Sequence, residues 1–342
     1  MKKQVKQMMC SAVAVMVLMS AGWTSVAQAP RVAAPADPAA PSAPAPQPIP
    51  QVKFPKLDLK NFTADSPTVE EVNSFLKAMW GYDENRVWQV AAIMKTQAPG
   101  VARVVVFVAD KTQPEKGTSS VFFTTPDGKH AIADKVMNFG AKPFAGDRAL
   151  LQARADGPAR GAKGNELMLV EFADLQCPHC KEAQDTMHNL MADFPEAKIV
   201  FENFPLTEIH PYASPAAAEG LCVRKAKGDA AFFVYAQNVY DKQEGLTQEN
   251  AAATLNAAAT AAGADPKAVT ACAATQATKD ELAAEVKLGT DLGIDQTPVL
   301  LVNGYALPLT SLPYSVLRRI IAYRANQDGI PVTLQPQLTT LK

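Results

Sequence analysis

The chain has 342 residues and a formal net charge of −1, and 48% of its residues are hydrophobic. This length and composition are enough for more than one buried core, so two folded domains are expected. The near-neutral charge and the lack of a basic stripe argue against nucleic acid as a partner.

The first 27 residues read as a secretory signal peptide. Lysines at positions 2, 3 and 6 precede an apolar run of about ten residues, from Ala12 to Ala21, and small-residue cleavage sites follow it. Ala27 is the favoured cleavage point. The run is shorter than the ~20 residues that span a bilayer, which favours a cleaved signal over a retained anchor. Export to the periplasm or another extracytoplasmic compartment is therefore predicted.

Residues 28–60 form a Pro/Ala-rich segment, in which nine of the 26 residues from Pro30 to Pro55 are proline. Such a composition cannot pack a core and prefers extended polyproline II, so a disordered linker is predicted. The sequence leaves open whether it acts as a tether or only as a spacer.

A small α+β domain is predicted over residues 62–145. Thr68 and Glu71 have the spacing of a capping box, and apolar residues then recur with helical period from Val69 to Met79. Asp127-Gly128 is a strong hairpin signal, beside which His130 is read as solvated or structural rather than catalytic. The predicted strands are Val87 to Met94, Val101 to Ala109, Ser120 to Thr125 and Ala131 to Met137.

Glycine-rich residues 146–166 predict a connection to a second domain over residues 150–326. A buried strand at 167–172, a helix and a strand at 197–204 form a βαβ unit, and a helical stretch follows at about 213–292. Two short strands come next, at 299–302 and 305–307, and residues 327–342 form a tail. The last helix of the domain has an apolar face made of Leu312, Val316, Leu317, Ile320 and Ile321.

The βαβ unit carries Cys177-Pro178-His179-Cys180 where its first strand gives way to its helix. Unpaired backbone N–H groups and the helix dipole stabilise a thiolate there, so the pKa of Cys177 should fall. Pro178 suits the first helical position, and His179 can add positive charge or a hydrogen bond. Cys177 is predicted to form the mixed disulfide with the substrate, and Cys180 is predicted to resolve it.

A stabilised Cys177 thiolate favours the reduced pair, so it makes the disulfide more oxidising. Each pKa unit corresponds to ~1.4 kcal/mol, or about 30 mV for a two-electron couple. The alternatives are an inert disulfide and half of a metal site. No second ligand pair has recognisable spacing, so no metal is predicted, and the disulfide itself makes a dissociable cofactor unnecessary.

Glu171 stands six residues before Cys177, in a strand that is otherwise apolar. A carboxylate there is costly unless it has a partner or a function. It is predicted to act as a base or proton relay for Cys180, with a structurally satisfied acid as the alternative.

The predicted export to an oxidising compartment decides how the remaining cysteines are interpreted. Cys10 precedes the apolar run and would leave with the signal peptide, so four cysteines remain. An even number in an exported chain favours disulfides, although it does not fix their pairing.

The cysteine motif after Val170-Glu171-Phe172, a helical insertion, and Thr297-Pro298 before an apolar strand together resemble the DsbA-like thiol:disulfide oxidoreductases. The resemblance implies a thioredoxin fold with an inserted helical subdomain, here preceded by the small α+β domain. It further implies a cis Pro298, with Thr297 beside the cysteine pair and its backbone available to a substrate peptide.

The resemblance also implies a structural disulfide between Cys222 and Cys272, inside the insertion. The chain-entropy estimate for a loop of this length is about 4 kcal/mol. A second redox pair that relays electrons is the competing interpretation. His210 is read as a loop or capping residue and His188 as a helix-surface residue.

Three functions follow from these features. The first is an exported enzyme that donates the Cys177–Cys180 disulfide to folding proteins; the family implies reoxidation by a membrane quinone-linked partner. The second is a dimeric isomerase or reductase kept reduced by a reductase, for which the extra N-terminal domain argues. The third is a binding or chaperone module, including a metal chaperone that uses Cys177, His179 and Cys180.

Overall fold

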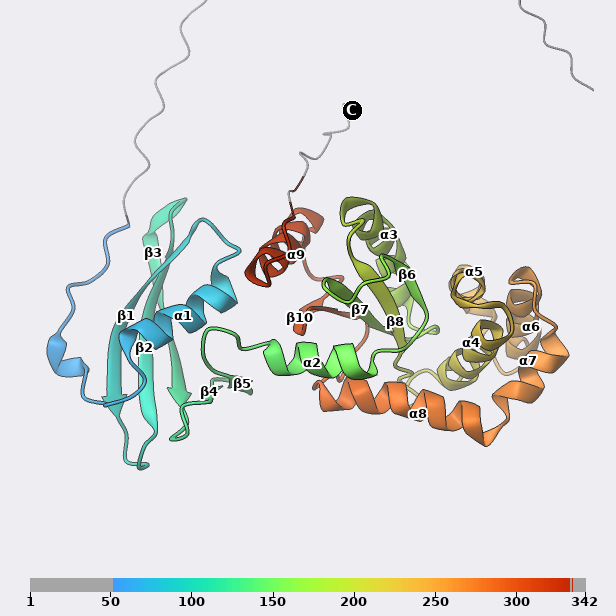
Figure 1. Ribbon diagram of the computed structural model, residues 1–342, viewed down its shortest axis with the longest axis horizontal. Coiled ribbons are helices and arrows are strands. Elements are labelled where there is room, and N and C mark those ends of the chain that lie inside the picture. Colours follow the sequence, from blue (N-terminus) through green and yellow to red (C-terminus); the bar gives the residue numbers. More distant parts are fainter. Residues whose placement is uncertain (1–51, 333, 335–342) are drawn as a thin grey trace, which may run out of the picture. The chain divides into compact units, whose positions relative to one another are not determined.

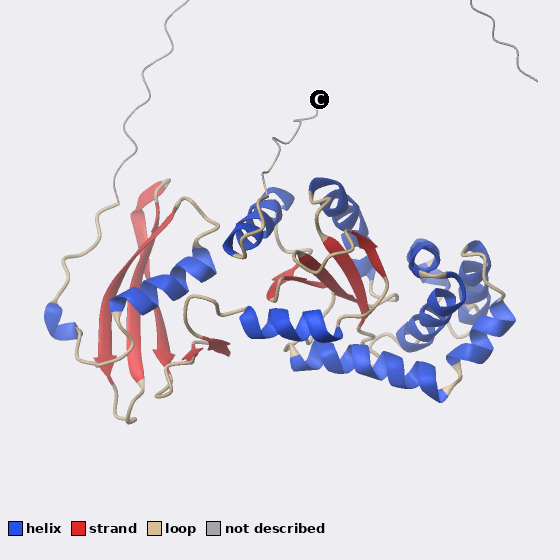
Figure 2. Ribbon diagram, in the orientation of Figure 1, coloured by secondary structure: helices blue, strands red, loops and turns tan. Residues whose placement is uncertain are grey.

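The structure is a computed structural model of the chain, and it describes residues 52–332 and residue 334. These residues form two five-stranded sheets, each packed against at least one helix (Figures 1 and 2). The predicted signal peptide and most of the predicted linker lie outside the described residues. No helix in the described part is long and apolar enough to cross a membrane.

The first sheet is antiparallel, has the strand order β1-β2-β3-β4-β5, and packs against α1 (Val69–Trp80). Helix α1 begins at the predicted capping box, where Thr68 Oγ1 accepts from Glu71 N at 3.1 Å and Glu71 Oε2 accepts from Thr68 N at 2.8 Å. A short 3₁₀ helix, η1 (Leu59–Asn61), precedes α1. The strands are β1 (Arg86–Lys95), β2 (Ala102–Asp110), β3 (Gln113–Thr124), β4 (His130–Ile132) and β5 (Val136–Asn138).

Two strand predictions in this sheet were wrong in extent. Strand β3 already begins at Gln113, because its polar, exposed first half is held by backbone pairing with β2 rather than by burial. The predicted strand from Ala131 to Met137 is instead two short strands, β4 and β5, with a tight turn between them. In both cases the extent of the strand depends on which strand it pairs with, and the alternation of apolar and polar side chains does not reveal that partner.

The predicted connection at 146–166 is largely regular structure. It contains α2 (Ala145–Arg154) and β6 (Ala159–Gly161), and β6 pairs antiparallel with the edge of the second sheet. Helix α2 buries only Leu151, which packs under that sheet. One buried side chain in ten residues gives too weak a periodicity to be recognised as a helix.

The second sheet has the order β10-β9-β7-β8-β6 and contains the predicted βαβ unit, since β7 and β8 are parallel. Side chains alternate along β7, so Leu169 joins the core under α3 and α9, whereas Val170 joins the core on the α2 and α8 side. Helix α9 begins after Pro313, which leaves Leu312 of the predicted apolar face before the helix. The elements are β7 (Met168–Ala173), α3 (Pro178–Asp193), β8 (Lys198–Asn203), β9 (Val299–Val302), β10 (Tyr305–Pro308) and α9 (Tyr314–Gln327).

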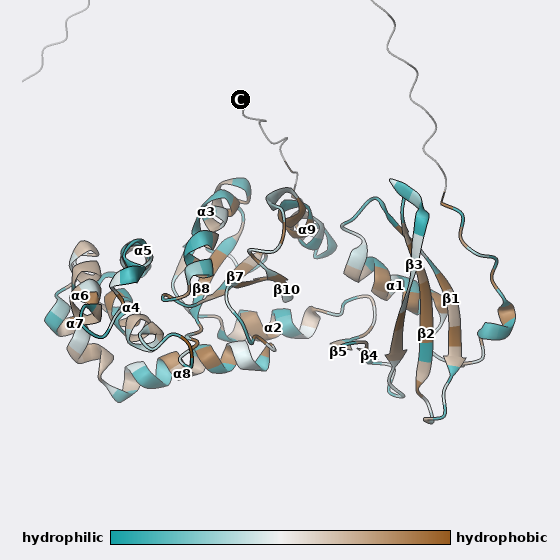
Figure 3. Cartoon of the chain, turned by 180° about the vertical axis from the view of Figure 1, so that it is seen from behind, coloured by the Kyte–Doolittle hydropathy of each residue, from teal (hydrophilic) through white to brown (hydrophobic). Residues whose placement is uncertain are grey.

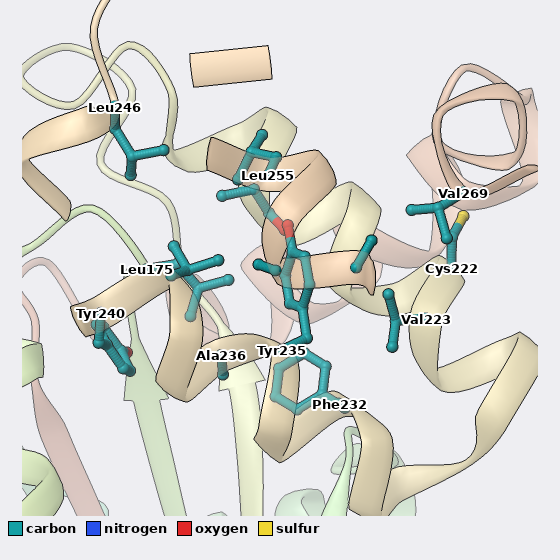
Figure 4. Close-up of a cluster of buried hydrophobic side chains, with 14 of the residues drawn as sticks. Leu175, Cys222, Val223, Phe232, Tyr235, Ala236, Tyr240, Leu246, Leu255 and Val269 are labelled. Atoms are coloured by element: carbon teal, nitrogen blue, oxygen red, sulfur yellow. The ribbon is translucent and has the colours of Figure 1, made fainter. Parts of the chain in front are cut away.

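A group of helices is inserted between β8 and β9. In Figure 3, α8 alternates between hydrophobic and hydrophilic stretches, as expected for a helix with one buried face. Aromatic side chains of α5 pack against α4, where a Cβ on Gly220 would lie 2.9 Å from Phe232 Cε2 (Figure 4). The elements are α4 (Ala213–Lys227), α5 (Asp229–Asp241), η2 (Gln243–Gly245), α6 (Ala251–Ala261), α7 (Pro266–Ala273) and α8 (Gln276–Asp291).

Candidate active site

Cys177 is the N-cap residue of α3, with φ −75° and ψ 123°, and Pro178 occupies the first helical position. Strand β7 ends at Ala173, so a loop of three residues carries the chain from the sheet to this cap. Cys177 and Cys180 are free thiols in the structure, and both residues are buried, at 4% and 0% exposure. Cys177 is therefore the more accessible of the two sulfurs.

The environment lowers the pKa of Cys177 to about 5, as expected at a helix N-terminus. The main cause is a hydrogen bond from the Cys180 thiol, and the backbone N–H groups of Cys180 and His179 add to it while burial opposes them. Burial raises the pKa of Cys180 well above its ordinary value, and the neighbouring Cys177 sulfur raises it further. At neutral pH the pair therefore holds one thiolate, on Cys177, and one buried thiol.

Thr297 and Pro298 lie against this pair although they are 120 residues away in sequence. The Thr297–Pro298 peptide bond is cis. Strand β9 follows directly and pairs antiparallel with β7, which brings the Thr297 carbonyl oxygen to 3.8 Å from Cys177 Sγ.

Glu171 is buried on β7 and faces α3. Gln184 Nε2 donates to Glu171 Oε1 at 3.0 Å and also to the carbonyl oxygen of Cys180 at 3.0 Å. Burial raises the pKa of Glu171 to about 7, although the Arg160 charge and the Gln184 hydrogen bond both act to lower it. The side chain thus has polar partners that the apolar sequence around it did not indicate, and Gln184 links it to the residue that carries the buried thiol.

The side chain of His179 contacts Glu182 rather than the Cys177 thiolate. Its imidazole is 65% exposed and pairs with Glu182 Oε2 at 3.1 Å. That pairing raises the pKa of His179, and the charge of Cys177 contributes less. His179 lowers the pKa of Cys177 through its backbone N–H, which donates a hydrogen bond to the thiolate.

Cys222 and Cys272 form a disulfide that joins α4 to α7, the pair that the resemblance implies. The Cys222 end is buried within the core of the insertion. The other histidines have local partners: His130 pairs with Asp127 at 3.2 Å beside the hairpin turn, and His188 bonds the Gln184 carbonyl at 2.9 Å.

Several residues of the site were missed by the sequence reasoning. Gln243 reaches in from η2 and donates to the carbonyl oxygens of Leu175 and Cys177 at 2.9 and 3.0 Å. Asp174 is buried and pairs with His210 Nδ1 at 2.8 Å. The position of Asp174 directly after a buried strand could have indicated a site residue, but no pattern in the sequence indicates Gln243.

A cavity of about 400 Å³ lies beside the two partners of Glu171: it is lined in part by Arg160 and Gln184, the two groups that act to lower the pKa of Glu171. Among residues 52–332 and 334, no group of three or more histidine, cysteine or acidic residues is arranged to hold a metal ion.

The second domain has a Cys-x-x-Cys pair at the start of α3 and a helical insertion before a cis-proline strand, and it is a DsbA-like thioredoxin domain. The family model described as Thioredoxin matches residues 154–322, which is just under half of the chain and corresponds to this domain. The predicted fold, a thioredoxin domain with inserted helices after a small α+β domain, is confirmed.

Similar solved structures cover about half of this chain. The catalytic domain of Proteus mirabilis ScsC is 22% identical with a TM-score of 0.44, over 52% of this chain and 98% of that one. Oxidised BdbD from Bacillus subtilis is 19% identical with a TM-score of 0.44, over 50% and 93%. The thiol-disulfide exchange protein alpha-DsbA2 from Wolbachia pipientis is 18% identical with a TM-score of 0.44, over 51% and 94%.

Curated relatives match only short segments. The Na(+)/H(+) antiporter NhaA 3 of Salinispora tropica is 38% identical over 58 residues, which is 17% of this chain and 9% of that protein. NhaA 1 of Salinispora arenicola is 35% identical over 74 residues, 22% of this chain and 11% of that protein. The chain thus spans about a tenth of the length of these relatives.

Proposed function

We propose that the protein is an exported oxidase that donates the Cys177–Cys180 disulfide to folding proteins. The observation that carries the proposal is the contrast between the two sulfurs, because the pKa of Cys177 is lowered to about 5 while that of Cys180 is raised. A stabilised thiolate favours the reduced pair. At pH 7 an ordinary thiol with a pKa of 9.0 is protonated, so lowering the pKa of Cys177 to about 5 stabilises the reduced pair by the two units between pH 7 and 5, which makes the disulfide roughly 60 mV more oxidising.

The reaction needs only the sulfurs of enzyme and substrate. A substrate thiolate attacks Cys177 Sγ, the Cys177–Cys180 bond breaks, and its electron pair leaves with Cys180 Sγ. A second substrate thiolate then attacks the substrate sulfur of the mixed disulfide and releases the Cys177 thiolate. The substrate loses two electrons and the enzyme pair gains them, so a membrane quinone-linked partner is proposed to reoxidise it.

Other residues have proposed roles in these steps. Glu171, which has a pKa near 7 and shares Gln184 as a hydrogen-bond partner with the Cys180 carbonyl, is suited to exchange the proton of Cys180. The Thr297–Pro298 backbone next to Cys177 is suited to pair with an extended substrate peptide. The Cys222–Cys272 disulfide is proposed to be structural, because it ties two helices of one core.

The test is oxidation of a reduced two-cysteine peptide by the oxidised protein, with the redox potential measured against glutathione. A potential well above that of an ordinary dithiol, and loss of peptide oxidation in Cys177→Ser, would support the proposal. A strongly reducing potential, or a pair found mostly as free thiols in cells, would overturn it.

A dimeric isomerase is the second candidate, and the N-terminal sheet favours it. Apolar side chains of this sheet are partly exposed: Val121, Phe123 and Ile132 at 37%, 38% and 37%. A homodimer through this part of the chain would cover them. Mass in solution at several concentrations, together with the cellular redox state of Cys177, distinguishes the isomerase from the oxidase.

A further inference from the structure

Asp174 occupies the loop between β7 and α3, and its carboxylate is fully buried. Its Oδ1 atom accepts from the backbone N–H of Gln176 at 2.7 Å. Its Oδ2 atom accepts from the backbone N–H of Leu206 and from His210 Nδ1, both at 2.8 Å. A buried carboxylate is tolerated when hydrogen bonds of this kind satisfy it, so Asp174 is locked in one orientation.

The two donors to Asp174 Oδ2 come from the segment that follows β8, some thirty residues later in the chain. There His210 N donates to the Leu206 carbonyl at 2.9 Å, which fixes the turn that presents both donors to Asp174. A second tie joins the same two segments, because the backbone N–H of Tyr212 donates to Gln176 Oε1 at 2.7 Å. The loop before Cys177 is therefore positioned from outside the β7–α3 unit.

The orientation of Asp174 matters because its backbone N–H points at the buried sulfur. Asp174 N lies 3.3 Å from Cys180 Sγ and donates to it. A fixed N–H dipole stabilises negative charge on the sulfur that it faces. Cys180 carries that charge only while the disulfide is being opened or resolved, since burial keeps it a thiol otherwise.

We propose that Asp174 and His210 are positioning residues for disulfide exchange, because the hydrogen bond between their side chains holds the Asp174 N–H against Cys180 Sγ. The inference rests on the proposed function and assigns a role to His210, which the sequence left open. When a substrate thiolate bonds to Cys177 Sγ, the electron pair of the breaking Cys177–Cys180 bond passes to Cys180 Sγ. The Asp174 N–H stabilises this leaving thiolate, and a better-stabilised thiolate leaves faster.

The experiment compares His210→Ala, His210→Gln and the control His188→Ala in the full chain. The rate of opening of the oxidised pair by reduced glutathione is followed by rapid acid quenching, alkylation and mass spectrometry. The equilibrium constant with glutathione is measured on the same samples. His188 is a matched control because it too is partly buried and holds one hydrogen bond, to the Gln184 carbonyl.

We expect His210→Ala to slow opening about tenfold, the size associated with loss of one hydrogen bond to a buried carboxylate. Its equilibrium constant should change less than twofold, because Cys180 is a thiol in the reduced protein at neutral pH. A glutamine at 210 can still donate to Asp174 Oδ2, so His210→Gln should recover most of the rate. His188→Ala should react like the wild type.

A wild-type opening rate in His210→Ala would overturn the positioning role. An equal change in rate and equilibrium constant would also overturn it, because that pattern indicates a general disturbance of the pair. If His210→Ala does not fold, Gln176→Ala removes the tie to Tyr212 and should slow opening too, and an unchanged rate there would equally refute the role. Failure of the wild type to exchange with thiols at all would refute the proposed function instead.

Discussion

Replacing Glu171 by glutamine should make the protein more stable at neutral and alkaline pH. Burial raises the pKa of this carboxyl from 4.5 to about 7 in the folded state. Between these values the folded protein binds more protons than the unfolded chain, so its stability falls as the pH rises. The difference between the two pKa values corresponds to about 3 kcal/mol, since one pKa unit is ~1.36 kcal/mol.

The gain in unfolding free energy of Glu171→Gln over the wild type should therefore depend on pH in a defined way. It should be constant below pH 4.5, grow by about 3 kcal/mol between pH 4.5 and 7, and level off above pH 7. Urea unfolding at closely spaced pH values measures it. Both proteins are kept in the oxidised form so that neither Cys177 nor Cys180 titrates.

Only the pH-dependent part of this difference is diagnostic, because glutamine also leaves the charge of Arg160 without its acidic neighbour. Glu182→Gln is the control, since its carboxylate is 66% exposed and should add no comparable rise. A Glu171→Gln curve that runs parallel to the wild type from pH 4 to 8 would refute a raised pKa at this carboxyl.

Three other outcomes can be checked. In the reduced protein, alkylation of Cys177 should rise with a midpoint near pH 5; a midpoint near 9 would mean that the start of α3 does not stabilise the thiolate. Replacing Cys222 and Cys272 by serine should lower the unfolding free energy in urea by about 4 kcal/mol while the glutathione equilibrium of the redox pair stays unchanged, and loss of that equilibrium would favour a relay role. Gly289→Ala should cost about 1 to 3 kcal/mol by thermal or urea unfolding, despite better helix propensity, because its Cβ would lie 2.6 Å from the Phe204 ring; a stability gain would contradict this packing.

The most local features were predictable from sequence. The capping box at Thr68 and the turn at Asp127-Gly128 depend on neighbouring residues, and both are present. The parallel unit around the cysteine motif is present as well, and the apolar runs of its two strands predicted it. Helix α2 and the first half of β3 were missed, because they are held by a single buried leucine and by backbone pairing with β2. Neither kind of contact leaves a period in the sequence.

By itself the sequence determined the redox motif, its place at the start of a helix and the direction in which the Cys177 pKa moves. Those properties follow from the Cys180 thiol and the backbone N–H groups within one turn of the Cys177 sulfur. Only the tertiary structure decided how Asp174 faces Cys180, because Asp174 is held by His210 from a distant segment. It also gave His210 a buried partner, Asp174, since burial and distance depend on how the whole chain packs.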